Sequence, residues 1–272
     1  MRGITKVGAS VSAAVMMVSG FVTSTSASAA SGDRPGRQLE AAVGPETSPP
    51  PAGFDNRRAA SADPKVKQAQ EILSGFGIPT GAVDGYWGPE TARGVCAFRR
   101  IAGIGTSRDP LDTKTLNTLV SYDRKYRYLR DIPAADYLGK HTYLVAQQTC
   151  QTIFYVEDNH YRRVFPTSTG VSGHRTPNGH YSLGSTLKGW YCSTLYPEGC
   201  RNHTEGFFAS VSPYGNMYNP RQVVGDIFVH GSMSVPAYPA SHGCVRLVVN
   251  DADWMYWHIP NYTPLFITGT PA

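Results

Sequence analysis

Five cysteines downstream of an export leader constrain this chain more than any other feature. Residues 1–6 are short and basic, residues 7–22 are apolar and uncharged, and Ala27-Ser28-Ala29 supplies the small residues of a cleavage site. This order predicts a signal peptide over residues 1–29; a retained membrane anchor is the alternative, although the stretch is rich in Ser, Gly and Ala. Thiols pair in an oxidising compartment, and an odd number leaves one over. We therefore expect a secreted fold with disulfides and one free thiol.

Residues 30–60 contain mainly Pro, Gly, Ser, Ala and scattered charge, with Pro49-Pro50-Pro51 and almost no large apolar side chain. Such a segment buries too little surface to repay ordering, so it predicts a flexible linker. No later segment is apolar enough to span a membrane, so we expect no stable membrane insertion after cleavage. The formal net charge of +5 is too small and too dispersed to indicate nucleic acid as a partner.

Residues 61–122 predict a small module of three short helices. Val66, Ala69 and Leu73 recur at helical spacing, and glycines follow. A loop over residues 83–91 contains the turn signals Asp84-Gly85 and Gly88-Pro89, and a second periodic run begins at Thr91. A linker over residues 123–140 leads into the rest of the chain.

Residues 141–272 predict a mainly β domain with a sandwich-like or barrel-like sheet, so the fold class is α+β with two domains. Short runs rich in β-branched and aromatic residues predict strands at 142–146, 152–157, 161–165, 207–212, 226–230, 245–249 and 265–268. Asp158-Asn159 and Asn178-Gly179 predict turns between such runs. One helix is expected near the end, capped by Asn250 or Asp251, with Trp254 and Trp257 in the core. The stretch Gly184–Gly206 has little periodicity and predicts a long loop that covers a site.

The cysteine pairing has two candidate bridges. Cys192 and Cys200 bracket a short ring with turn residues between them, which makes them the first expected disulfide. Cys96 lies about 130° from the apolar face of its helix, and Cys150 lies in an expected turn, so a bridge between them is the second option. These pairings leave Cys244 as the free thiol.

Cys244 directly precedes an apolar strand, and His230 ends an expected strand fourteen residues earlier. A nucleophilic thiol needs a base or an imidazolium beside it, and two residues at the ends of neighbouring strands can supply that pair. Zinc held by His230, His242 and Cys244 is the rival interpretation. The sequence lacks the tight ligand spacing of secreted zinc hydrolases and has no H-E-x-x-H, so we expect no metal and no cofactor.

The segment from His230-Gly231 to Ser241-His242-Gly243-Cys244-Val245-Arg246 resembles the active-site signature of the L,D-transpeptidase catalytic domain, the YkuD family. The segments Phe165–Gly170 and Arg175–Tyr181 are similar to other characteristic stretches of that family. Residues 61–122 resemble the peptidoglycan-binding domain type 1 family, which shares the loop from Asp84 to Thr91. In the following helix Gly94 and Arg99 replace the usual Ala and Gln. A helical spacer that binds nothing is the alternative for this module.

The resemblance implies that Cys244 attacks the carbonyl of residue 3 in a tetrapeptide stem, breaks its bond to the terminal D-alanine and forms a thioester. His230 would act as the base, oriented by the carbonyl of Gly231, and an amine acceptor would complete a 3→3 cross-link. The amides near His242, Gly243 and Cys244 would form the oxyanion hole. Ser241, His242 and Arg246 would line the substrate site. Arg246 would bind a stem carboxylate, with a structural salt bridge as the alternative role.

Two alternatives to cross-linking stay open: an L,D-carboxypeptidase with water as the acceptor, and a non-catalytic wall-binding protein. The implied partners are peptidoglycan stem peptides and glycan. The implied location is the cell wall, and we expect a monomer.

Overall fold

The computed structural model describes residues 61–195 and 215–271. The expected signal peptide, the linker over residues 30–60 and the expected strand at 207–212 lie outside this part of the chain, as does the second half of the loop Gly184–Gly206. Within the described ranges, no helix is both long and apolar enough to cross a membrane.

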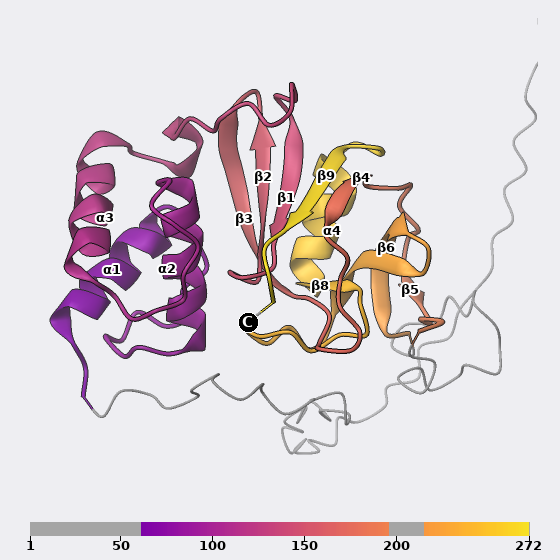
Figure 1. Cartoon of the computed structure of the whole chain (residues 1–272), viewed down its shortest axis with the longest axis horizontal. Helices are drawn as coiled ribbons and strands as arrows, with labels where there is room; N and C mark the ends of the chain where they lie inside the picture. Colours follow the sequence, from indigo (N-terminus) through magenta and orange to yellow (C-terminus); the bar gives the residue numbers. More distant parts are fainter. Residues whose placement is uncertain (1–60, 196–214, 272) are drawn as a thin grey trace, which may run out of the picture. The chain divides into compact units, whose positions relative to one another are not determined.

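The first elements within the described residues are three short helices, α1 (Pro64–Gly75), α2 (Pro89–Ile101) and α3 (Thr113–Lys125) (Figure 1). Asp63 and Asp112 cap α1 and α3 by accepting backbone amides at 2.7 Å, and Pro89 occupies the first position of α2, where its missing N–H costs nothing. At Gly94, an added Cβ would lie 2.5 Å from the Pro79 carbonyl oxygen. The close approach of α2 to this segment therefore explains why glycine replaces alanine there.

Gln70 of α1 fixes the loop before α2. Its Oε1 accepts the amides of Asp84 and Gly85 at 3.0 and 2.7 Å, and its Nε2 donates to Asp84, Tyr86 and Thr91 at 3.0–3.2 Å. The side chain is 1% exposed, so burying its amide without these partners would destabilise the fold. The polar loop is thus fastened to the helix from inside the module.

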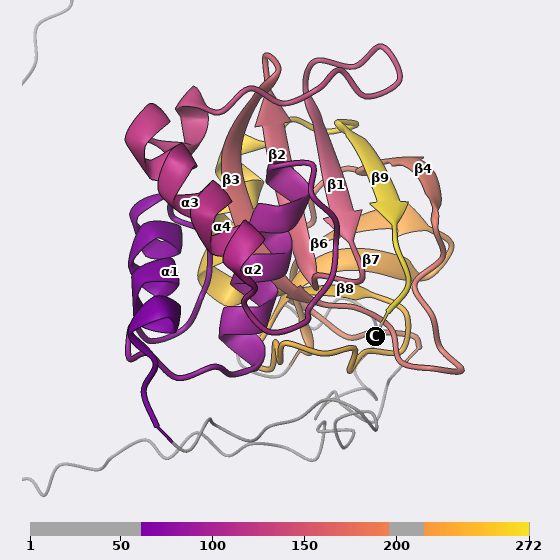
Figure 2. The same cartoon turned by 60° about the vertical axis from the view of Figure 1, so that its left-hand side comes forward.

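A short 3₁₀ turn, Leu129–Asp131, leads into one nine-stranded mixed sheet (Figures 1 and 2). Its order is β4-β9-β1-β2-β3-β8-β7-β6-β5; β1 pairs parallel with β9, β7 pairs parallel with β8, and the other pairs are antiparallel. The strands are β1 (Tyr143–Gln147), β2 (Thr152–Glu157), β3 (His160–Ser168), β4 (Gly179–Ser182), β5 (Trp190–Tyr191), β6 (Met217–Val224), β7 (Ile227–Ser232), β8 (Val245–Val248) and β9 (Pro264–Thr268). Helix α4 (Val249–His258) follows β8 and packs against β6, β7 and β8.

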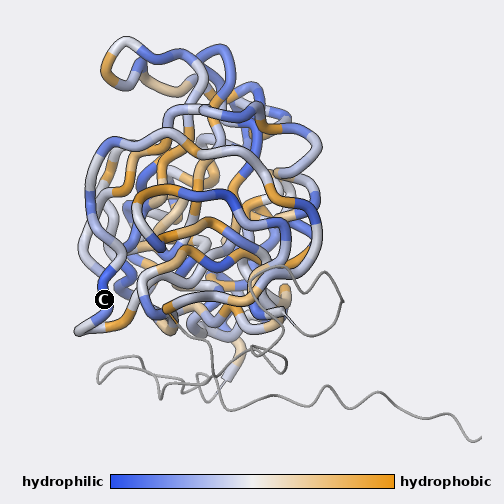
Figure 3. Tube along the Cα trace, turned by 90° about the vertical axis from the view of Figure 1, so that its right-hand side faces the viewer, coloured by the Kyte–Doolittle hydropathy of each residue, from blue (hydrophilic) through white to orange (hydrophobic). Residues whose placement is uncertain are grey.

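The two larger hydrophobic clusters of the described residues lie on opposite faces of the sheet, because successive side chains of a strand point to opposite sides. A smaller third cluster contains Met217, Phe228 and Cys244. Tyr143 and Val145 of β1 belong to the cluster shared with α1, α2 and α3, whereas Leu144 and Ala146 belong to the cluster shared with α4. Hydrophobic stretches accordingly gather in the middle of the trace in Figure 3. The three helices and the sheet therefore share a core.

The structure confirms the α+β fold class, with a helical region followed by a mainly β region. The turn at Asp158 and Asn159 forms as expected, with φ of +51° and +58°. Strands β4, β5 and β6 were not predicted, and Gly179 begins β4 rather than lying in a turn. The core prediction is right for Trp254, which packs against Phe165, and wrong for Trp257, which is 65% exposed.

Candidate active site

The parallel pairing of β7 and β8 brings the expected site residues together. Val229 aligns with Val245 and His230 with Arg246. Because Val229 and Val245 point into the α4 core, the alternating His230 and Arg246 lie on the opposite face, and Cys244 is on that face by the same alternation. Adjacent strands about 4.8 Å apart and a two-residue offset of about 6.6 Å place the backbones of His230 and Cys244 roughly 8 Å apart. This separation is within reach of the two side chains.

The Cys244 thiol is buried, at 5% exposure. Its Sγ accepts the Phe228 amide at 3.4 Å and lies 3.7 Å from the Asp226 carbonyl oxygen, to which it can donate. Burial raises the pKa of Cys244 to about 11, although the Phe228 amide and the charge of Arg246 act in the opposite direction. At neutral pH Cys244 is therefore a thiol rather than a thiolate.

The His230 ring has its tautomer fixed by one hydrogen bond. Nδ1 lies 2.9 Å from the Gly231 carbonyl oxygen, which can only accept, so Nδ1 carries the proton and Nε2 the lone pair. Burial lowers the pKa of His230 to about 4, and the charge of Arg246 adds to this effect. The ring is a neutral base at pH 7.

Burial shifts the pKa of each group toward its neutral form, so the resting site holds a thiol and a neutral imidazole.

The turn before Cys244 is fixed by hydrogen bonds and a glycine. Ser241 Oγ donates to the Cys244 carbonyl at 2.5 Å and accepts the Gly243 amide at 3.1 Å. Gly243 has φ of +117°, and an added Cβ would lie 2.6 Å from Ile227 Cδ1, so only glycine fits. The Gly243 amide thus has Ser241 Oγ as its acceptor in the resting structure, and the oxyanion hole stays a prediction.

Thr176 is a site residue to which the sequence assigned no role. Its Oγ1 donates to the Gly243 carbonyl at 2.8 Å and accepts the Gly170 amide at 2.9 Å, so it ties the turn to the segment after β3. The sequence signal that could have identified Thr176 is its position in Arg175–Tyr181, a stretch that resembles the YkuD family. The neighbouring His174 ring lies 4.9 Å from that of His242, which puts two imidazoles beside the turn.

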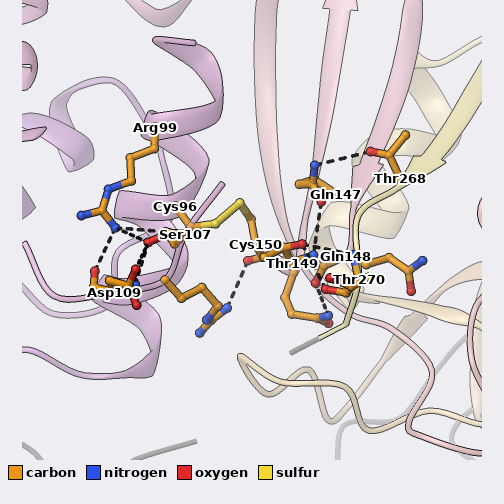
Figure 4. The surroundings of a disulfide bond; sticks show 12 residues. Cys96, Arg99, Ser107, Asp109, Gln147, Gln148, Thr149, Cys150, Thr268 and Thr270 are labelled. Carbon is orange, nitrogen blue, oxygen red and sulfur yellow. Dashed lines mark hydrogen bonds between the residues drawn. A yellow bond between two sulfur atoms is a disulfide. The ribbon is translucent and has the colours of Figure 1, made fainter. Parts of the chain in front are cut away.

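A disulfide joins Cys96 of α2 to Cys150 in the turn after β1 (Figure 4). It is the second of the two bridges considered from the sequence. Cys192 is buried and also disulfide-bonded, whereas Cys200 lies outside the described residues, so the Cys192–Cys200 pairing stays a prediction. Cys244 is a free thiol.

Across the described ranges, no cluster of three or more His, Cys, Asp or Glu side chains is arranged to hold a metal ion. Cys244 supplies a free thiol and His230 a neutral imidazole.

Comparison with known proteins gives two family matches. Residues 141–267 match the L,D-transpeptidase catalytic domain, YkuD, and residues 62–107 match the family described as "Putative peptidoglycan binding domain". Both resemblances drawn from the sequence are therefore confirmed.

Individual relatives are more distant. "Putative L,D-transpeptidase YciB" of Bacillus subtilis is 31% identical over 99 residues, and the match spans 34% of this chain and 46% of that protein. An L,D-transpeptidase structure from Xylanimonas cellulosilytica is 26% identical with a TM-score of 0.47, covering 81% of this chain and 100% of that one. One from Stackebrandtia nassauensis is 19% identical with a TM-score of 0.43, covering 82% and 98%. TM-scores below 0.5 say nothing about the site.

Proposed function

Since this chain carries an L,D-transpeptidase catalytic domain behind a peptidoglycan-binding domain, we propose that it is an exported cysteine acyltransferase that forms 3→3 cross-links in peptidoglycan. The observation that carries the proposal is that strand register puts a free Cys244 and a His230 of fixed tautomer on the same face of β7 and β8. The disulfide between Cys96 and Cys150 supports action outside the cytoplasm, where thiols are oxidised.

In the acylation step, Cys244 Sγ attacks the carbonyl carbon of stem residue 3 while His230 Nε2 takes the thiol proton. The tetrahedral intermediate collapses, the bond to the terminal D-alanine breaks, and His230 returns the proton to the departing amine. The products are a thioester on Cys244 and free D-alanine. The imidazolium formed in transit is stabilised by the Gly231 carbonyl, which accepts from Nδ1.

In the second step, the side-chain amine of another stem attacks the thioester and gives its proton to His230. Collapse forms the new amide and expels the Cys244 thiolate, which recovers the proton from His230. Water in place of the amine gives a trimmed tripeptide stem, which is the carboxypeptidase reaction. The nature of the acceptor therefore separates the two activities.

The helical module supports wall binding through a cavity of about 220 Å³. Its lining combines apolar side chains with polar ones at the starts of α1 and α3, and it includes the loop shared with the peptidoglycan-binding family: Asp63, Lys65, Val66, Gly85, Trp87, Pro110, Leu111, Asp112, Thr113 and Leu116. Trp87→Ala is expected to reduce co-sedimentation with purified peptidoglycan. The matched control is Trp257→Ala, which removes an exposed tryptophan of α4, and equal loss in both variants would argue against this cavity.

The test of the catalytic proposal is product analysis by mass spectrometry after incubation with disaccharide tetrapeptide. The proposal predicts a 3→3 cross-linked dimer from the wild type and none from Cys244→Ala or His230→Gln. Tripeptide without dimer would identify a carboxypeptidase. Dimer formation by Cys244→Ala would refute the assigned nucleophile.

A further inference from the structure

Arg93 of α2 is a buried charged residue that the catalytic proposal does not use. It is 2% exposed, and one of its nitrogens, Nη1, lies 2.8 Å from the carboxylate of Glu90. Burying a guanidinium is costly unless its donors are satisfied. The buried Nε has no hydrogen-bond partner among the described residues, so the partners of Nη2 indicate what the residue does.

The second nitrogen, Nη2, reaches out of the helical module into the β region. It donates to the Thr167 carbonyl at 3.1 Å and the Pro236 carbonyl at 2.7 Å, with the Val235 carbonyl at 3.5 Å. Thr167 lies at the end of β3, where it pairs with Leu247 of β8. One buried cation therefore joins the end of β3 to the segment that follows β7.

Residues 233–241, here termed the connecting segment, link the strand that carries His230 to the turn that carries Cys244. The connecting segment is also held from β3: Ser168 Oγ donates to the Tyr238 carbonyl at 2.7 Å, and the Thr169 carbonyl accepts the amides of Ala240 and Ser241 at 2.9 and 3.1 Å. Arg93 thus holds the first half of the segment, and β3 holds the second half.

A second link runs from the same helix to the same place. Cys96, one turn after Arg93, is bonded to Cys150. The adjacent Gln151 accepts the Thr169 amide at 2.8 Å and donates to Thr169 Oγ1 at 2.9 Å, which fixes the residue that binds the end of the connecting segment. Helix α2 is therefore linked to the connecting segment in two ways. Arg93 binds it directly, and the Cys96–Cys150 disulfide is linked to it through Gln151 and Thr169.

We infer that Arg93 is a positioning residue for the active site, so that the peptidoglycan-binding module is a structural part of the catalytic centre as well as a wall-binding unit. The inference rests on the proposed function for its catalytic consequence. Loss of the Arg93 contacts frees the connecting segment and displaces Cys244 relative to His230. Displacements of about 1 Å can cost on the order of a hundredfold in rate.

Arg99 provides a matched control on the same helix. It is 4% exposed and makes six hydrogen bonds, against four for Arg93. All its partners lie inside the helical module: Ser107, Asp109, Pro110, Asp112 and Thr115. Figure 4 shows Arg99 directed toward Ser107 and Asp109. Removing Arg99 disturbs the module without touching the connecting segment.

The experiment compares Arg93→Ala with Arg99→Ala in the full chain by hydrogen exchange and by acyl-transfer kinetics. In Arg93→Ala, amides of the connecting segment are expected to exchange at least about tenfold faster than in the wild type, and amides of residues 107–112 are expected to be unchanged. In Arg99→Ala, the opposite pattern is expected. The kcat is expected to fall about ten- to a hundredfold in Arg93→Ala, with a smaller change in KM. Arg93→Lys, which keeps the charge with a shorter reach, is expected to be intermediate.

Unchanged exchange in the connecting segment of Arg93→Ala, or an equal effect from Arg99→Ala, would overturn the inference. If Arg93→Ala does not fold, Arg93→Lys and Arg99→Lys carry the same comparison. Absence of turnover in the wild type would count against the proposed function, while the exchange measurement would still test the role of Arg93.

Discussion

Removal of the Cys96–Cys150 disulfide tests how strongly the helical module and the sheet depend on each other. Both cysteines are fully buried and 54 residues apart in the sequence. The chain-entropy relation for a loop of this length gives a stabilisation of about 4 kcal/mol, because the bridge restricts the unfolded chain. We expect Cys96→Ala/Cys150→Ala to lose about this much free energy of unfolding.

The assay is urea denaturation without reductant, followed by circular dichroism. With a urea dependence of about 2–3 kcal/mol per molar, the expected loss lowers the midpoint by about 1.5–2 M. Each single variant should lose about as much as the double variant, since either one breaks the bond. A midpoint lowered by less than about 0.5 M would refute the reasoning.

Three further predictions follow from the site and the module. Burial lowers the pKa of His230 to about 4, so the unfolded chain takes up a proton at a higher pH than the folded protein does. The free energy of unfolding of the wild type should therefore fall by about 3 kcal/mol between pH 6.5 and pH 4. Urea unfolding at both pH values should show no such loss in His230→Gln. Alkylation of Cys244 by iodoacetamide, read by peptide mass spectrometry, should accelerate about tenfold per pH unit between pH 7 and 10; a plateau near neutrality would contradict the raised thiol pKa. Gln70→Leu removes five hydrogen bonds in the module and should lower the free energy of unfolding by about 3 kcal/mol. The melting temperature should fall by roughly 6–12 °C. A shift below about 2 °C would show that the loop does not depend on Gln70.

Local sequence patterns, namely helical periodicity and apolar runs, predicted much of the fold. Helical periodicity predicted α1 and α2, because Ala69 and Leu73 of α1 and Val95 and Phe98 of α2 belong to the same core. Strand β2 matched residues 152–157 because its apolar run is bounded by turns on both sides. These elements follow from short-range chemistry that a sequence displays directly.

The missed strands depend on partners far along the chain. Strand β4 has only intermediate or exposed residues, and it forms by pairing its backbone with β9. Strand β6 contains Pro220 and a buried Arg221, whose guanidinium donates to the Gly184, Ile259 and Pro260 carbonyls at 2.8–3.0 Å. A proline and a charged residue speak against a strand until those partners are known.

The residue types and their spacing were enough to propose Cys244 and His230 as the candidate site. The resting charge state was not, because it depends on the burial of Cys244 and His230 and on Arg246 beside them. The role of Arg93 was equally hidden, since its carbonyl partners lie 74 to 143 residues away. Helix periodicity says nothing about such contacts.

The most direct test of the central claim is the intact mass of the mature protein after brief incubation with disaccharide tetrapeptide. The account predicts an adduct equal to the substrate minus D-alanine, located on Cys244 by peptide mapping and lost on addition of hydroxylamine. The adduct should be absent from Cys244→Ala. An adduct on another residue, or cross-linked product without any acylated Cys244, would contradict the account.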